Sequence, residues 1–222
     1  MTKRPILFNG AMVRALLAGS KTQTRRVIKD QSIGERFSHM TEDGRAHLEW
    51  LGTPCCGTGV WDVPEYSAQV ACPYGQPGDR LWVRESFMPI PLEAAPGPSQ
   101  TPWSIAYAAG GQTELLAPSS YNPTLYNYER WTPSMHMPRW ASRINLEITS
   151  VRVERLQDIS EADAQAEGWT RRPEVSTDPQ VHKEAARDWF MDLWESINGP
   201  GSWGVNPWVW VVEFRSVEVA AR

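Results

Sequence analysis

A cluster of reactive side chains lies directly behind the first short helix that the sequence predicts. Residues 19–26 read Gly-Ser-Lys-Thr-Gln-Thr-Arg-Arg, which brings one amine, two guanidiniums and several hydroxyls into one short segment. Amines and guanidiniums donate hydrogen bonds to carboxylates, phosphates and carbonyls. The cluster therefore predicts a site for an anionic or amide-bearing ligand, with Lys21, Arg25 and Arg26 as its cations.

A helix before the cluster would hold it in place. Asn9 is a good N-cap, and Gly19 stands where a left-handed glycine commonly ends a helix. The apolar residues between them fall at helical spacing, at Met12, Leu16 and Leu17. We therefore expect the cluster to start at a helix end.

Composition limits the classes of protein that the chain can belong to. The 222 residues are 41% hydrophobic and 22% charged, which is ordinary for a globular protein. No apolar run approaches the roughly 20 residues that a membrane helix needs, and no signal peptide follows the N-terminus, so we expect a cytoplasmic protein without membrane contact. The net charge of −4 excludes a generally basic nucleic-acid coat, so polyanion binding would need a local patch.

Three cysteines, Cys55, Cys56 and Cys72, favour reduced thiols over a disulfide framework. With His39 and His47 upstream they leave a zinc site open, but adjacent cysteines match the usual ligand spacing poorly. Small buried hydrophobic residues are the favoured interpretation. We expect neither a metal nor a cofactor.

Four segments read as one scaffold, at about residues 5–29, 77–89, 139–170 and 181–217. The second contains an alternating strand over 81–87 that places Glu85 on the apolar face. The third contains a strand over 144–153 whose phase shifts near residues 149–150, which indicates a bulge or bend.

Two helices and a final strand complete the scaffold. Ser160 begins a short helix with a capping box, which places Glu167 in the last turn of that helix. An amphipathic helix over 181–197 carries its apolar residues at Val181, Ala185, Trp189, Leu193, Trp194 and Ile197. The strand over 208–214 is apolar on both faces in its first half, which favours a covered position in a sheet.

Two segments, at about residues 30–76 and 90–138, differ from the scaffold in composition and periodicity. They are rich in Pro, Gly, Ser and Tyr and lack sustained periodicity, which predicts two long ordered loop insertions. Together the segments predict a single α+β domain over residues 1–222, with a curved or barrel-like sheet and a few flanking helices.

With these segments in place, the chain resembles the ASCH family of PUA-like domains, and most closely its longer bacterial and prophage-encoded members. The resemblance covers the scaffold and not the insertions. It is carried by the helix and cluster at 12–26, the turn and strand at 77–85, the segment 163–169 and the strand 208–214.

The resemblance implies a PUA-like fold with a cleft for a base or nucleotide. Small bacterial members hydrolyse the amide of N4-acetylcytidine with a lysine and a threonine of the Lys-Thr-x-Thr motif and with a glutamate, which fall here on Lys21, Thr24 and Glu167. In this interpretation Lys21 is a base toward the Thr24 hydroxyl or a water, and Glu167 handles the proton of the leaving amine. The geometry requires a bend, because residues three apart in a strand face opposite sides.

The remaining site residues are assigned to binding. Arg25, Arg26, Arg84 and Glu85 are the expected substrate-binding residues, with Arg84 or a backbone N–H at the oxyanion. The plainer interpretation of Lys21, Arg25 and Arg26 is a solvated, salt-bridged strand end, and that of Glu85 is an ion-pair partner for Arg25 or Arg84.

Two other functions stay open. A non-catalytic module could read one base of RNA or DNA, with arginines on the phosphates, and a ribonuclease is a third alternative. The expected partner is accordingly a modified pyrimidine nucleoside or single-stranded nucleic acid; the sequence does not decide the oligomeric state.

Overall fold

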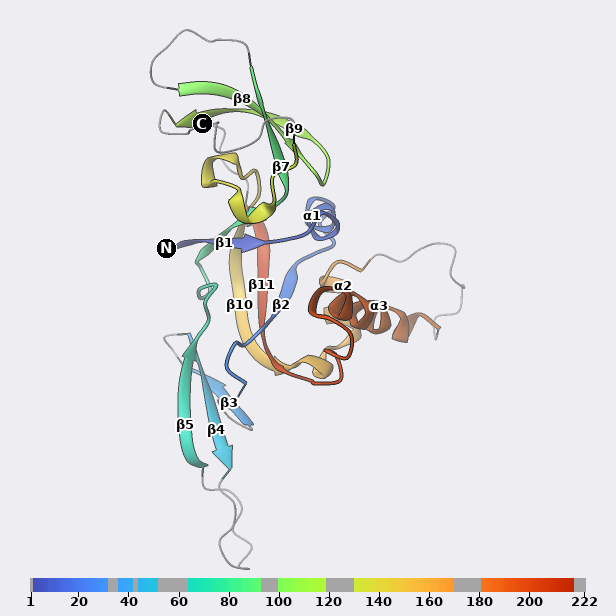
Figure 1. Cartoon of the computed structure of the whole chain (residues 1–222). Coiled ribbons are helices and arrows are strands. Elements are labelled where there is room, and N and C mark those ends of the chain that lie inside the picture. Colours follow the sequence, from blue (N-terminus) through green and yellow to red (C-terminus); the bar gives the residue numbers. More distant parts are fainter. Residues whose placement is uncertain are drawn as a thin grey trace, which may run out of the picture. The chain divides into compact units, whose positions relative to one another are not determined.

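Strands dominate the fold, and helices are few. A computed structural model describes residues 2–31, 36–41, 44–51, 64–92, 100–118, 130–169 and 181–217. The elements are β1 (Lys3–Leu7), α1 (Gly10–Leu17), β2 (Gln23–Val27), β3 (Arg36–Met40), β4 (Arg45–Leu51), β5 (Pro64–Ala71), β6 (Arg80–Arg84), β7 (Phe87–Pro91), β8 (Gln100–Tyr107), β9 (Gln112–Pro118), η2 (Ser134–His136), η3 (Arg139–Ala141), β10 (Asn145–Arg155), η4 (Leu156–Asp158), α2 (Glu161–Ala166), α3 (Val181–Asn198) and β11 (Trp208–Val217) (Figure 1).

The α+β class is confirmed, and none of the sheets formed by the described residues closes into a barrel. The chain packs as two compact units, and a single domain stays a prediction. Unit 1 comprises residues 1–19, 80–147 and 216–222, and unit 2 comprises residues 20–79 and 148–215. Among the described helices, none combines the length and the apolar character that a membrane span requires.

Unit 1 contains β1, which the sequence did not predict, beside β6. β1 runs parallel to β6, with Lys3 opposite Arg80 and Leu7 opposite Arg84. The start of β10 pairs antiparallel on the other edge of β6, with Asn145 opposite Trp82. The prediction failed at β1 because a five-residue strand with a single buried side chain, that of Ile6, shows no clear alternation.

The strand predicted over 81–87 is two strands. β6 ends at Arg84, and β7 begins at Phe87 and pairs with β8 instead. The sequence pattern continued across the break between β6 and β7, because Glu85 and Phe87 are both buried, as expected for the apolar face of one continuous strand. Burial alone therefore did not reveal where the chain changes sheets.

The predicted loop insertions are wrong as loops, because the first contains a three-stranded antiparallel sheet and the second contains most of another, whose first strand starts at Phe87 in the predicted scaffold. These sheets have the orders β3-β4-β5 and β7-β8-β9. β7 carries Pro89 and Pro91, which lack a backbone N–H and are tolerated on an edge strand such as this one. A register shift interrupts β3 against β4 between Phe37 and His39. The prolines of β7 and the register shift of β3 interrupt the alternation of apolar and polar residues, so the sequence did not show these strands.

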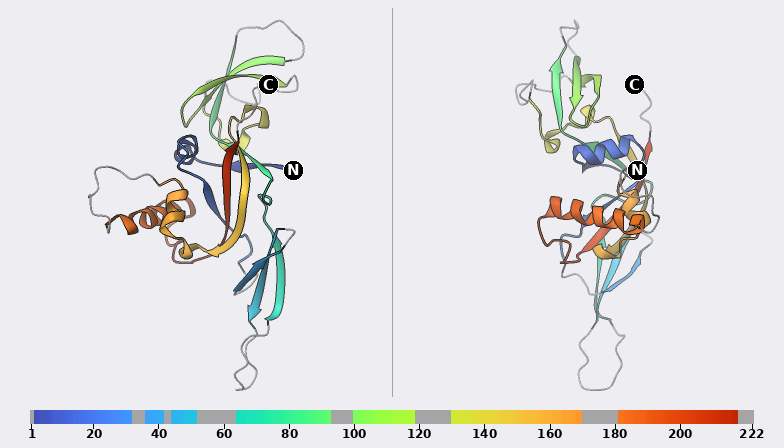
Figure 2. Two further views of the ribbon diagram at one scale, coloured as in Figure 1. Left: turned by 180° about the vertical axis from the view of Figure 1, so that it is seen from behind. Right: turned by 90° about the vertical axis from the view of Figure 1, so that its right-hand side faces the viewer.

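Unit 2 contains most of β10 beside β11, which pairs antiparallel with β2. The phase shift predicted in β10 is confirmed in its burial, because the buried positions change from Leu146 and Ile148 to Val151 and Val153. α2 and α3 lie next to each other, as both views of Figure 2 show.

The core of unit 2 lies between these helices and β11. α3 buries Ala186, Phe190 and Trp194 against this core, whereas Trp189 is only partly buried and Ile197 is 49% exposed. The predicted apolar face of α3 was therefore rotated by one residue from the observed one. Trp189 and Leu193 lie next to the observed buried face of α3, so the sequence favoured the wrong face as equally apolar. The other members of this core are Leu156, Ile159, Ala164, Val209 and Val211.

Candidate functional site

The site in unit 2 is built where the chain entering β2 meets the end of α2. Asn9 caps α1 by accepting a hydrogen bond from the Met12 amide at 2.9 Å, and Gly19 turns the chain with a φ of 74°. Lys21 then forms an isolated antiparallel bridge with Glu167, beside a hydrogen bond of 2.8 Å from the Thr22 amide to the Ala166 carbonyl. The helix stop thus places Lys21 next to Glu167.

The capping box predicted for α2 is confirmed. The Ser160 hydroxyl accepts a hydrogen bond from the Asp163 amide at 3.1 Å, and the Asp163 carboxylate accepts one from the Ser160 amide at 3.4 Å. Glu167 is the C-cap residue of the same helix. A carboxylate is unfavourable there because the helix dipole places partial negative charge at this end. The cations of β2 compensate for that cost.

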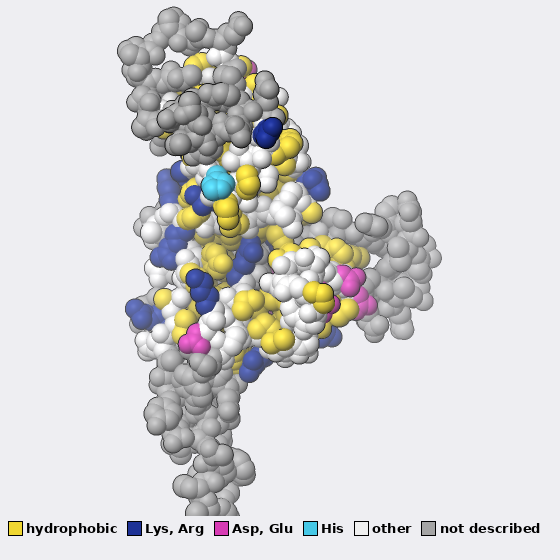
Figure 3. All heavy atoms as spheres, viewed as in Figure 1, with side chains coloured by type: hydrophobic (Ala, Val, Ile, Leu, Met, Phe, Trp, Pro, Cys, Tyr) yellow, Lys and Arg dark blue, Asp and Glu magenta, His cyan; other side chains and the backbone are white. Residues whose placement is uncertain are grey.

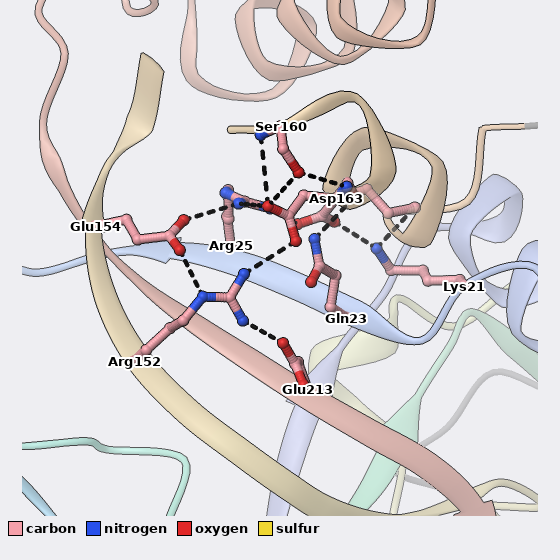
Figure 4. A network of polar contacts seen from close by, with 9 residues as sticks. Lys21, Gln23, Arg25, Arg152, Glu154, Ser160, Asp163 and Glu213 are labelled. Atoms are coloured by element: carbon pink, nitrogen blue, oxygen red, sulfur yellow. Dashed lines mark hydrogen bonds and ion pairs between the residues drawn. The ribbon is translucent and has the colours of Figure 1, made fainter. Parts of the chain in front are cut away.

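Lys21 and Glu167 form a buried ion pair. The Lys21 Nζ donates to Glu167 Oε2 at 2.7 Å and to the Glu167 backbone carbonyl at 2.9 Å (Figure 4). Lys21 is 2% exposed and Glu167 is 3% exposed. Burial lowers the pKa of the Lys21 amine from its ordinary value of 10.5; the charges of Arg26 and Arg25 lower this pKa further, and Glu167 opposes them. At a given pH, a larger fraction of the Lys21 amine is therefore neutral than in an exposed lysine.

Arg25 lies on the other side of the Glu167 carboxylate. Its Nη1 is 3.6 Å from Glu167 Oε1, while its Nη2 is 2.9 Å from Glu154 and 3.3 Å from Asp163. The Nε and Nη1 of Arg25 and the Oε1 of Glu167 are buried and make no hydrogen bond to described residues. Nη1 and Oε1 are thus an ion pair that is too long for a hydrogen bond, and the Nε donor has no acceptor among the described residues, which is costly for a buried group.

Carboxylates that the sequence did not single out surround the cations. Arg152 on β10 pairs with Glu154, with Asp163 at 2.9 Å and with Glu213 on β11. Gln23 donates to the Asp163 carbonyl at 2.8 Å. Carboxylates from three neighbouring elements thus neutralise the cluster, which disfavours a simple anion site. The one signal in the sequence was the alternation of Arg152 and Glu154 on a single strand face.

Thr24 lies away from this pair, and the bend that we expected between Lys21 and Thr24 is absent. The pairing of β2 with β11 is regular from Gln23 to Val27, and Phe214 donates to Thr22 at 2.8 Å. Lys21, Gln23 and Arg25 all reach toward α2 (Figure 4), so alternation directs Thr24 to the opposite face. Thr24 is nonetheless buried, with 1% exposure.

The other predicted binding residues are divided between the units. Arg26 lies half-buried on β2 in unit 2, whereas Arg84 and Glu85 belong to unit 1. Glu85 is paired with neither Arg25 nor Arg84: it accepts two hydrogen bonds from Arg143, from Nε at 2.8 Å and from Nη2 at 3.0 Å. The expectation of an ion-pair partner was correct in kind and wrong in residue.

Comparison of the chain with protein-family models, with curated proteins and with solved structures gave no match. In the described part of the chain, no group of three or more His, Cys, Asp or Glu side chains could hold a metal ion. Cys72 is buried and forms no disulfide bond with a described residue. Cys55 and Cys56 lie outside the described residues, so the zinc alternative is not tested.

Proposed function

We propose that unit 2 binds a modified pyrimidine nucleoside and hydrolyses the exocyclic amide of an N4-acylated cytidine, on a PUA-like scaffold of the ASCH type. The observation that carries this proposal is the buried pair of Lys21 and Glu167, which joins an amine of lowered pKa to a carboxylate at 2.7 Å. Strongly perturbed titratable groups with a specific charge partner are concentrated at functional sites.

The chemistry requires a base for a nucleophile and an acid for the leaving amine. In its neutral form, Lys21 accepts a proton from a water as that water attacks the acyl carbonyl carbon. The resulting ammonium is stabilised by Glu167, through which the proton passes to N4 as the carbon–nitrogen bond breaks. The products are cytidine and the free carboxylic acid, so atoms and charges balance.

Arg25 is the group best suited to the tetrahedral oxyanion. Its Nε and Nη1 donors are buried and make no hydrogen bond to described residues, and Nη1 lies 3.6 Å from the Glu167 carboxylate that also pairs with Lys21. Donors that are already desolvated and fixed stabilise developing charge well, and one such donor is commonly worth about 3 kcal/mol. This role replaces the expected one of Arg84.

Water is favoured over Thr24 as the nucleophile. Three residues of extended chain separate the Lys21 and Thr24 Cα atoms by about 10 Å, and the two side chains face opposite ways. Because Lys21, Arg25 and Glu167 are each at most 4% exposed, the side chains around them must move to admit a substrate.

The non-catalytic reader is less well supported at this cluster. Its phosphate contacts would use Arg25, whose side chain is 0% exposed and faces three carboxylates. A phosphate would have to displace these carboxylates in a site of low dielectric, where like charges repel strongly.

Chromatography of reactions with N4-acetylcytidine tests the proposal through matched variants. Lys21→Met should abolish release of cytidine, while the exposed Lys29→Met should retain it. Thr24→Val should retain most of the activity if water attacks directly. Loss of activity in Thr24→Val together with normal folding would instead establish Thr24 as the nucleophile.

A further inference from the structure

Unit 1 has a charge balance opposite to that of the whole chain. Its residues include nine Lys or Arg against six Asp or Glu, whereas unit 2 has thirteen against twenty. A net charge of −4 therefore divides into +3 and −7. Such asymmetry within one chain is a common sign of a local polyanion-binding surface.

The positive charge of unit 1 gathers on one face of β6. Arg80, Trp82 and Arg84 alternate on this face, while Leu81 and Val83 are buried on the other. The register adds Lys3 of β1 beside Arg80. Figure 3 shows Lys and Arg side chains in dark blue around β1, with Asp and Glu in magenta elsewhere in the view.

Two guanidiniums share the Trp82 ring. The Cζ of Arg84 is 4.7 Å and that of Arg139 is 5.7 Å from the ring centroid. The indole attracts each cation, but the two cations repel each other. An anion bound between them would remove this repulsion.

Three hydrogen-bond donors on the same face lack acceptors. The Nε of Arg80, the Nε of Arg84 and the Nδ2 of Asn145 are buried and donate to no described residue. Asn145 lies opposite Trp82 in register, is 8% exposed, and accepts from Arg139 through its Oδ1 at 2.5 Å. Leaving such donors unsatisfied is costly, so they favour a ligand that brings oxygen acceptors.

The spacing of these donors suits a chain of anions. Same-face residues of a strand are about 6.7 Å apart, so Arg80 and Arg84 are separated by about 13 Å, too far for one phosphate. The carboxylate of Glu147, opposite Arg80 in register, limits the attraction at that end of the face.

We infer that the β6 face of unit 1, defined by Lys3, Arg80, Trp82, Arg84, Arg139 and Asn145, binds the phosphates of single-stranded nucleic acid. A flexible single strand can follow this face, and the Arg80 and Arg84 side chains must shift for its phosphate oxygens to reach the buried Nε and Nδ2 groups. Trp131, which is 53% exposed in the same unit, offers a ring on which a base can stack. This inference does not depend on hydrolysis by unit 2.

Fluorescence anisotropy with a labelled single-stranded RNA of about 16 nucleotides tests the surface. Each lost phosphate contact lowers the slope of log affinity against log salt by about 0.7. The double variant Arg80→Gln/Arg84→Gln should therefore lower the slope by about 1.4 and weaken binding about 25-fold at 0.1 M salt. Arg80→Lys/Arg84→Lys keeps the charge and should retain most of the slope.

A matched pair of exposed cations in unit 2 controls for net charge. Lys29→Gln/Arg215→Gln should change the affinity less than twofold. Equal weakening in both double variants, absence of RNA binding at about 50 mM salt, or binding to phosphatidylserine vesicles in place of RNA would each overturn the inference. Unchanged thermal unfolding of the lysine variant confirms that the face stays folded.

Discussion

Removing one partner of the Lys21–Glu167 pair should destabilise the protein by much more than removing both. Glu167→Gln leaves the Lys21 ammonium with the backbone carbonyl at 2.9 Å as its acceptor and without a counter-charge at the 2.7 Å position. Lys21→Met leaves Glu167 with Arg25 at 3.6 Å. Breaking a buried pair in this way costs about 3 kcal/mol or more, whereas replacing both partners by uncharged groups is often neutral.

Equilibrium urea unfolding, followed by tryptophan fluorescence, gives the free energies of the two single variants and the double variant. Two single losses of about 3 kcal/mol each and a nearly neutral double variant give a coupling energy of about 6 kcal/mol between the two positions. The exposed Lys29→Met should change stability by less than about 0.5 kcal/mol. Additive single effects, or single effects as small as that control, would refute a buried ion pair.

The pH dependence provides an independent check. Because burial lowers the pKa of Lys21 in the folded protein, the unfolded chain binds more protons at this site between the lowered pKa and 10.5. The stability of the wild type relative to Lys21→Met should therefore rise with pH across that window, by up to about 1.4 kcal/mol per pH unit. A flat difference would contradict the lowered pKa.

Three further changes test other parts of the structure. Burial would raise the pKa of Asp163, but the Ser160 hydrogen bond and the charges of Arg25 and Arg152 lower it overall. The folded protein therefore gains stability from the ionised carboxylate above pH 3.8 and loses that stability below this pH. Acid unfolding of Asp163→Asn should lack this loss. Burial raises the pKa of Tyr107 to about 12, so the stability that its neutral phenol contributes should fall between pH 10 and 12. In an ultraviolet titration, Tyr107→Phe should lack the phenol that ionises near pH 12. A Cβ at Gly111, where φ is 89°, would lie 2.8 Å from Arg143 Nη1, at the end of a side chain that Glu85 holds through Nε and Nη2. Moving Arg143 would disturb this ion pair, so Gly111→Ala should lower the thermal midpoint more than Gly110→Ala, where the Cβ meets open space. Equal effects would mean that Arg143 moves aside freely and that only backbone strain matters.

Local chemistry made part of the site predictable. The Asn9 cap, the Gly19 stop and the capping box at Ser160 depend on residues a few positions apart, and each is present as expected. The cluster and the helix end at Glu167 could therefore be located from the sequence. Their meeting was expected from the family resemblance, and the bridge between Lys21 and Glu167 is observed.

Pairing over long distances made the rest unpredictable. Arg25 and Glu154 are 129 positions apart, and Arg152 and Glu213 are 61 apart, so these contacts depend on the order and register of β2, β11 and β10. No local pattern encodes that register. A cluster that looks cationic in the sequence is therefore neutralised in the fold, and the unbalanced positive charge lies in unit 1.

A single-turnover reaction with enzyme in excess over N4-acetylcytidine measures the proposed hydrolysis without the need for turnover. We expect stoichiometric release of cytidine and acetate by the wild type and none by a folded Glu167→Gln variant. Intact N4-acetylcytidine after prolonged incubation with folded wild type would contradict the proposed hydrolysis.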